Sequence, residues 1–148
     1  GMAWLVEGHI VVETKLIRPH ESWAAADWNP ASEEVHGIPR RDLDDAEPAE
    51  SVARGFLARV GSGQLVSDAP AHDGWWLRRL LETIGEPVLE IHDFDQVAWS
   101  AFSSEGQIAP GRLSKVYKNM TGRRVAAHRA GEDARHLAAA FRAGFPKA

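Results

Sequence analysis

The stretch V-A-A-H-R-A-G-E-D-A-R-H-L-A-A-A-F-R, Val125 to Arg142, decides how the rest of the chain is interpreted. Its alanine-rich part predicts a helix from about Ala130 to Ala143. His128 and Asp133 flank the start of this helix, and their spacing does not match the three or four positions that separate neighbours on one helical face. We therefore expect His128 in the segment leading into the helix and Asp133 in its first turns, with both side chains near its N-terminus.

Further helices are predicted immediately before this stretch. Leu113, Val116, Tyr117 and Met120 have helical spacing, and Thr121-Gly122 closes that helix. An earlier helix contains Val97, Trp99 and Phe102 and is capped by Asp93 or Asp95. Between these two helices, residues 106–110 are predicted to form a loop.

Strands alternate with helices in the middle of the chain. The predicted strands are residues 64–68 and 88–91. One predicted helix has a buried face made of Val52, Phe56, Leu57 and Val60, and another runs from about Asp73 to Ile84. Glycines at positions 61 and 85 end these two helices. Such alternation predicts an α/β fold with partly parallel strands.

The N-terminal part predicts a β-hairpin. Residues 3–6 and 9–17 are apolar and rich in β-branched side chains, and Glu7-Gly8 between them is a short turn signal. In residues 20–41 the apolar side chains follow neither the helical nor the strand period, so an ordered loop with one short helix is predicted there. The hairpin adds an antiparallel portion to the predicted sheet.

Length and composition favour a single cytoplasmic domain spanning residues 2–148. The chain has 148 residues, which is the size of one ordinary domain, and it contains no cysteine, so disulfides and thiolate metal sites are excluded. No apolar run approaches a membrane span, and no basic-then-apolar leader is present. Gly1 precedes Met2, which predicts that the natural chain starts at Met2. The formal charge of -4 argues against coating nucleic acid by bulk electrostatics.

Three segments, taken in order, resemble the DEDDh 3'-5' exonucleases of the ribonuclease H-like superfamily. They are V-H-G-I at 35–38, V-S-D-A-P-A-H-D-G-W-W-L at 66–77 and H-R-A-G-E-D-A at 128–134. The family has an H-G-I element after its hairpin, an aspartate at a later strand-to-helix turn, and a third motif H-x-A-x-x-D. The resemblance covers nearly the whole chain and implies a ribonuclease H-like mixed sheet flanked by helices.

The resemblance also implies a chemistry and roles for individual residues. In the family, four carboxylates hold two divalent ions, Mg²⁺ or Mn²⁺, at the 3' end of single-stranded DNA or RNA, because two ions can activate water and stabilise the leaving oxygen. Carried over, Asp73 and Asp133 are metal ligands and His128 is the general base. His36, Trp75 and Arg129 are candidate substrate contacts.

The family's first motif, D-x-E on its first strand, is missing from this sequence. The two hairpin runs match the family's second and third strands, and neither Glu7 nor Glu13 occupies the position of a first-motif carboxylate. The absent strand is central in the resembled sheet, so its neighbours would leave backbone groups unpaired. A shifted pairing, a second copy of the chain or an upstream segment would have to replace it, and the first two favour a homodimer.

Each candidate residue has a structural alternative. Asp73 could cap the helix that follows it, Asp133 could be a solvated first-turn acid, and His36 could belong to a turn before glycine. Trp75 and Trp76 could stack nucleobases, but the spacing of Trp76 with Leu77, Leu80 and Leu81 predicts that at least one is core. Arg123, Arg124 and Arg129 form a small basic rim. Two functions stay open: an exonuclease-like domain with an incomplete site, or an inactive nucleic-acid-binding or protein-assembly module on the same scaffold.

Overall fold

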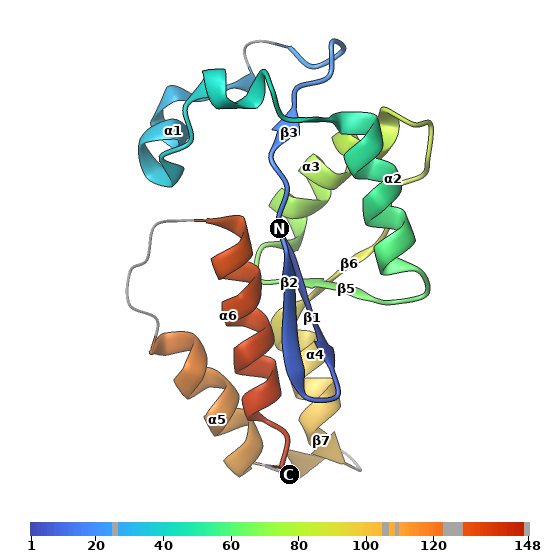
Figure 1. Ribbon diagram of the computed structural model, residues 1–148. Helices are drawn as coiled ribbons and strands as arrows, with labels where there is room; N and C mark the ends of the chain where they lie inside the picture. Colours follow the sequence, from blue (N-terminus) through green and yellow to red (C-terminus); the bar gives the residue numbers. More distant parts are fainter. Residues whose placement is uncertain (25–26, 105–106, 109, 123–128, 147–148) are drawn as a thin grey trace. The chain divides into compact units, whose positions relative to one another are not determined.

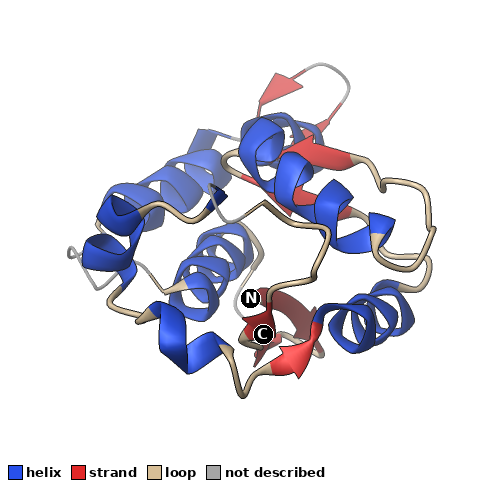
Figure 2. Cartoon of the chain, turned by 90° about the horizontal axis from the view of Figure 1, so that it is seen from above, coloured by secondary structure: helices blue, strands red, loops and turns tan. Residues whose placement is uncertain are grey.

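The computed structural model in Figure 1 describes residues 1–24, 27–104, 107–108, 110–122 and 129–146. The chain is mixed α/β as predicted, with long helices and short strands (Figure 2). Its contacts divide it into two compact units. The first is Gly1–Thr14, Val66–Asp68 and His92–Ala148, and the second is Lys15–Leu65 and Ala69–Ile91. A single domain over residues 2–148 stays a prediction.

Helices α4, α5 and α6 and the N-terminal hairpin dominate the first unit. The elements that lie wholly or mostly in it are β1 (Met2–Val6), β2 (His9–Glu13), β5 (Leu65–Ser67), β6 (Ile91–Asp93), α4 (Phe94–Phe102), β7 (Ser103–Ser104), β8 (Gln107–Ile108), α5 (Pro110–Thr121) and α6 (Ala130–Ala143). Figure 1 shows α6 between α5 and the hairpin, in contact with both.

The second unit is built around helices α2 and α3. Its elements are β3 (Ile17–Arg18), α1 (Pro30–His36), a short 3-10 helix (Arg40–Leu43), β4 (Glu47–Pro48), α2 (Ala49–Val60) and α3 (Pro70–Glu82). The predicted short helix in residues 20–41 is therefore α1. Pro70 occupies the first turn of α3, where its missing N–H costs nothing, so this helix starts three residues before the predicted Asp73.

The hairpin turn follows from local backbone preference. Glu7 and Gly8 have φ angles of 50° and 79°, and positive φ at both central residues is what a type I′ two-residue turn requires. The strands are antiparallel, and the register pairs Met2 with Glu13. The predicted second strand extended to residue 17, but β2 ends at Glu13. Ile17 instead starts β3, which pairs in parallel with β4 of the second unit.

Among the described strands, pairing is two by two: β1 with β2, β3 with β4, β5 with β6, and β7 with β8. The strand predicted at residues 88–91 is displaced to β6, and Asp93 at its end caps α4 by accepting a hydrogen bond of 3.1 Å from the Gln96 N–H. Part of the loop predicted at residues 106–110 forms β8. The finer prediction, a ribonuclease H-like sheet without its first strand, stays a prediction.

Each unit has its own hydrophobic core. The first joins the apolar faces of α4, α5 and α6 through Phe94, Ala98, Phe102, Leu113, Val116 and Ala140. The second joins α2 and α3 through Ala49, Ala53, Leu77, Leu80 and Leu81. These residues recur at the three- and four-residue intervals that place side chains on one helical face. No helix in the described part of the chain combines the length and apolarity needed to span a membrane.

Candidate functional site

Asp133 lies in the first turn of α6, as predicted. Arg129 is the N-cap residue of this helix, with an extended backbone and no side-chain cap bond. The Asp133 N–H donates a hydrogen bond of 2.9 Å to the Arg129 carbonyl. The Asp133 side chain is half-buried and its Oδ1 atom is inaccessible to solvent, which contradicts the alternative of a fully solvated acid. His128, the predicted general base, lies outside the described residues.

Asp73 occupies the equivalent position in α3. Ala69 is the N-cap residue there, and the Asp73 N–H donates to the Ala69 carbonyl at 3.0 Å. Asp73 is therefore one turn inside the helix and is not its N-cap residue. Its side chain is exposed. A negative charge in the first turn is stabilised by the helix dipole, so the position suits an aspartate without any ligand.

The two aspartates belong to different units, Asp73 to the second and Asp133 to the first. Within the described residues, no group of three or more histidine, aspartate or glutamate side chains comes together in a way that could hold a metal ion. The described carboxylates alone therefore do not form the two-ion centre that the resembled family uses.

A close helix-to-hairpin contact positions Asp133. A Cβ atom at Gly131 would overlap the Thr14 side chain, so only glycine allows α6 to approach the end of β2 this closely. At the other end of α6, the Arg142 Nη1 donates a hydrogen bond of 3.2 Å to the Gly8 carbonyl in the hairpin turn. Both ends of α6 thus contact the hairpin, and Asp133 lies next to the first of these contacts. A glycine inside an otherwise strong helix was the available sequence signal for this contact.

His36 has a structural role in the described chain. It ends α1, and Gly37 follows with a φ angle of 60°, the left-handed conformation that ends many helices. The His36 Nδ1 accepts a hydrogen bond of 3.0 Å from the Ile38 N–H, and its ring packs edge-on against Trp28. His36 therefore has a local structural role at the end of α1, and substrate contact by His36 stays a prediction.

Arg129, another candidate substrate contact, is exposed at the start of α6. The other two residues of the predicted basic rim, Arg123 and Arg124, lie outside the described residues. The rim therefore stays a prediction, carried in the described chain by Arg129 alone.

Trp75 and Trp76 are both on the surface of α3, with 46% and 40% of their area exposed. The prediction that at least one of the two is core is wrong. The buried face of α3 is centred on Leu77, and consecutive helical residues are about 100° apart, so Trp76 lies at the flank of that face. Arg79 and Asp27, which sequence analysis missed, hold the first indole: the guanidinium lies 5.1 Å from the Trp75 ring centroid.

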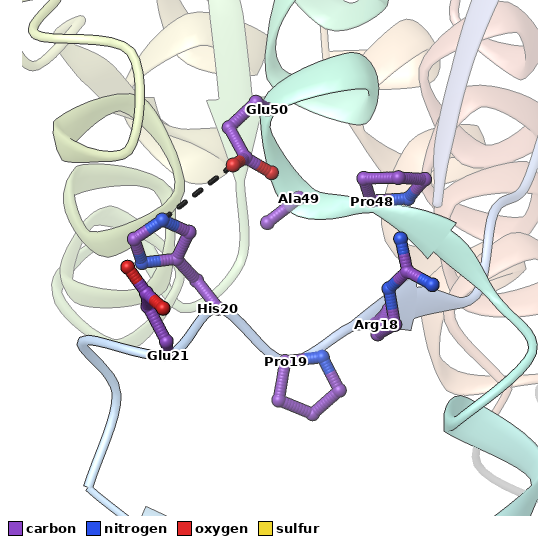
Figure 3. A pocket seen from close by; sticks show the side chains of 7 residues that line it. All are labelled: Arg18, Pro19, His20, Glu21, Pro48, Ala49 and Glu50. Carbon is purple, nitrogen blue, oxygen red and sulfur yellow. Dashed lines mark ion pairs between the residues drawn. The ribbon is translucent and has the colours of Figure 1, made fainter.

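A polar pocket of about 300 Å³ lies in the second unit (Figure 3). Its lining residues are Arg18, Pro19, His20, Glu21, Pro48, Ala49 and Glu50. The His20 Nδ1 accepts from the Ser22 N–H at 3.2 Å and lies 2.7 Å from the Ser22 Oγ. The other ring nitrogen, Nε2, faces the Glu50 Oε1 at 3.6 Å.

The residue types around this pocket are those of a hydrolytic serine–histidine–glutamate triad, but the geometry is that of a turn. Ser22 is not one of the lining residues, and its N–H and its hydroxyl both contact the same ring nitrogen two residues earlier. Such local bonds are common for serine in turns. The geometry therefore gives no support for a serine nucleophile at this pocket.

A hydrogen-bonded chain of side chains joins α4 to α5. The Trp99 Nε1–H donates to the Tyr117 hydroxyl oxygen at 3.0 Å, and the Tyr117 O–H donates to the Asp95 carboxylate at 3.1 Å. Burial, followed by the hydrogen bond to Asp95, raises the pKa of Tyr117 above its ordinary value of 10.0. Both effects favour the neutral phenol.

Tyr117 is the only tyrosine in the chain, so its titration can be followed by ultraviolet absorbance near 295 nm. We expect the titration midpoint of Tyr117 in the folded chain to lie above the midpoint for the same chain unfolded in urea. The midpoint in folded Asp95→Asn should be lower than in the folded natural chain. Because the folded pKa is raised, its contribution to stability is present below the unfolded pKa and lost as pH rises through the folded one. Equal midpoints in buffer and urea would contradict this.

The chain matches no protein-family model, no curated protein and no solved structure. The resemblance to the DEDDh exonucleases rests on the three sequence segments alone.

Proposed function

We propose that this chain is a cytoplasmic exonuclease-like domain of ribonuclease H-like type that binds the 3' end of a single DNA or RNA strand and has an incomplete catalytic site. The order of the three sequence segments supports this proposal. So does the hairpin near the start of the chain, since the resembled family also places a hairpin before its H-G-I element.

The observation that carries the proposal is the matched position of Asp73 and Asp133. In each helix, the aspartate N–H donates a hydrogen bond to the carbonyl of the N-cap residue and so completes the first turn. Neither N-cap residue, Ala69 or Arg129, caps its helix with a hydrogen bond from its side chain. The helix dipole stabilises a negative charge in the first turn, and the family resemblance assigns a metal-ligand role to both aspartates.

The described carboxylates are two of the four that the resembled family uses, so they do not fit a two-ion centre. Asp73 and Asp133 are the metal-ligand candidates, for Mg²⁺ or Mn²⁺, that the family motifs carry over to this chain. His128 is the base candidate retained from the family motif. A strand end can bind without hydrolysis, and the net charge of -4 predicts that such binding is weak and strongly salt-dependent.

The first test is incubation of 5'-labelled single-stranded DNA and RNA oligonucleotides with Mn²⁺, in parallel with Asp73→Asn, Asp133→Asn and His128→Ala. We expect no stepwise 3' shortening by any of the four proteins. We also expect a linear strand to bind more tightly than a circular strand of equal length. Shortening by the natural chain that Asp133→Asn abolishes would show a complete site, and equal affinity for linear and circular strands would contradict end binding.

The hairpin favours protein assembly as a second function. In this two-stranded sheet Val6 and Val11 are exposed on one face, and Val12 lies on the opposite face, beside Gly131 of α6. We propose that a second copy of the chain covers this hairpin and forms a homodimer.

Sedimentation velocity at micromolar concentration should therefore show a dimer. Val11→Lys should shift it to monomer, because a charge would be placed in the apolar contact. Val88→Lys, at a more exposed valine outside the hairpin, is the matched control and should leave the dimer intact. A compact monomer of the natural chain would contradict the homodimer.

A further inference from the structure

The exposed tryptophan pair on α3 is the surface feature that the fold itself leaves unexplained. Trp75 and Trp76 contact each other edge to face, with ring centroids 4.5 Å apart and planes at 84°. They are 46% and 40% exposed, although burying an aromatic side chain is among the largest single gains available to a protein. Two adjacent indoles left on a surface indicate a ligand that covers them.

The surroundings of Trp75 hold it in one orientation. The Arg79 guanidinium lies 5.1 Å from the Trp75 ring centroid, and Arg79 Nη2 forms an ion pair of 2.7 Å with Asp27 Oδ2. The side chains of Arg79 and Asp27 are mostly covered, at 21% and 26% exposure, so this ion pair is better protected from solvent than an ordinary surface pair. The indole is therefore positioned before any ligand arrives, which lowers the entropy cost of binding.

The charge around the pair selects the class of ligand. Arg78 is exposed three residues after Trp75, so it lies on the same side of the helix, whereas Arg79 is already paired with Asp27. Flat aromatic rings beside an exposed arginine match a nucleobase attached to a phosphate backbone, because bases stack on indoles and a guanidinium group binds phosphate. An apolar protein partner would gain less from arginines beside the rings.

We propose that Trp75 and Trp76 form a stacking platform for an unpaired nucleobase of a single strand, and that Asp27 and Arg79 position Trp75. This inference rests on the proposed function for its substrate class and extends it by naming the surface that contacts the bases. Stacking on an indole depends on the flat face that every base has, so the platform tolerates any sequence but requires unstacked bases. Duplex DNA, with its bases paired, should bind less tightly than the single strand.

The test is fluorescence anisotropy of a labelled oligothymidine at low salt, with the full chain and its variants. Trp75→Ala should weaken binding by about 5- to 100-fold, the range expected for loss of one stacked base. Trp75→Phe should retain most of the affinity, because phenylalanine keeps an aromatic face. Trp99→Ala is the matched control: Trp99 is also 46% exposed but lies on α4 of the first unit, and its replacement should change the affinity less than twofold.

A strand of the same length with abasic sites should bind the natural chain as weakly as the normal strand binds Trp75→Ala. Asp27→Asn should weaken binding of the normal strand but not of the abasic strand, which a purely structural role for Asp27 would not produce. The proposal is overturned if Trp75→Ala binds the normal strand like the natural chain, or if the natural chain binds neither strand.

The linear and circular strands separate this inference from the proposed end binding. Equal affinity for both, lost in Trp75→Ala, would support the platform while contradicting end binding. A preference for linear strands that is unchanged in Trp75→Ala would support end binding and contradict the platform. If no strand binds and Trp75→Ala abolishes self-association, the pair is a protein contact and the platform is wrong.

Discussion

Replacement of Phe102 by alanine should lower the free energy of unfolding by about 3–5 kcal/mol, the usual cost of removing a buried phenylalanine. Phe102 ends α4 inside the first core, and its ring centroid lies 5.3 Å from that of Phe141 and 5.2 Å from that of Phe145. A Cβ atom at Gly144 would overlap the Phe102 ring, so the backbone after α6 is packed directly against it. The loss of the ring would leave a cavity between α4 and α6.

Urea unfolding followed by circular dichroism measures this effect as a shift of the midpoint. Phe145→Ala is the matched control, because it removes the same side chain from the same ring cluster at an exposed position. We expect the control to cost less, about 1–3 kcal/mol, because Phe145 makes two aromatic contacts, with Phe102 and Phe141, at about 0.5–1.5 kcal/mol each. Equal midpoints for the two variants would contradict the placement of Phe102 in the core.

Replacement of Leu81 by alanine should cost about 2–5 kcal/mol in the second unit. Leu81 is fully buried on α3, in the cluster that includes Leu77 and Ala53 of α2. No polar atom is lost, so the cost comes from the removed methyl groups and from the cavity that α2 and α3 cannot close completely. Because α3 also carries Trp75 and Asp73, this core supports the proposed binding surface.

The same substitution at Leu16 is the matched control for Leu81, since Leu16 is exposed in the same unit. We expect Leu16→Ala to change the free energy of unfolding by less than about 0.5 kcal/mol, as most surface substitutions do. Hydrogen exchange should report faster exchange of α2 and α3 amides in Leu81→Ala. If Leu81→Ala were as stable as Leu16→Ala, the described burial of α3 would be wrong.

Local signals in the sequence were sufficient for the secondary structure of most of the chain. Glu7-Gly8 specified the hairpin turn, Gly61 ended α2, and the periodic apolar residues of α5 and α6 predicted both helices. Each of these depends on the conformational preferences of a few neighbouring residues. The placement of Asp133 in the first turn of α6 followed from the same kind of signal.

Pairing between distant segments was not predictable from local pattern. The run after β2 has the β-branched composition of a continuing strand, but Ile17 pairs with Glu47, thirty residues further on. The composition of a segment indicates whether it can form a strand. Which strand it pairs with depends on how distant segments pack together. The ribonuclease H-like sheet expected from the family resemblance depends on such pairings, which is why it stays a prediction.

By itself, the sequence determined the α/β class, the hairpin turn, most helix ends and the two first-turn aspartates, because turn chemistry, capping and helical periodicity act within a few residues. Only the tertiary structure decided that Trp76 is exposed, that Gly131 lies against Thr14, and that Asp27 anchors Arg79 beside Trp75. These contacts join segments far apart in the chain. Their formation depends on how the cores pack, and no local pattern specifies it.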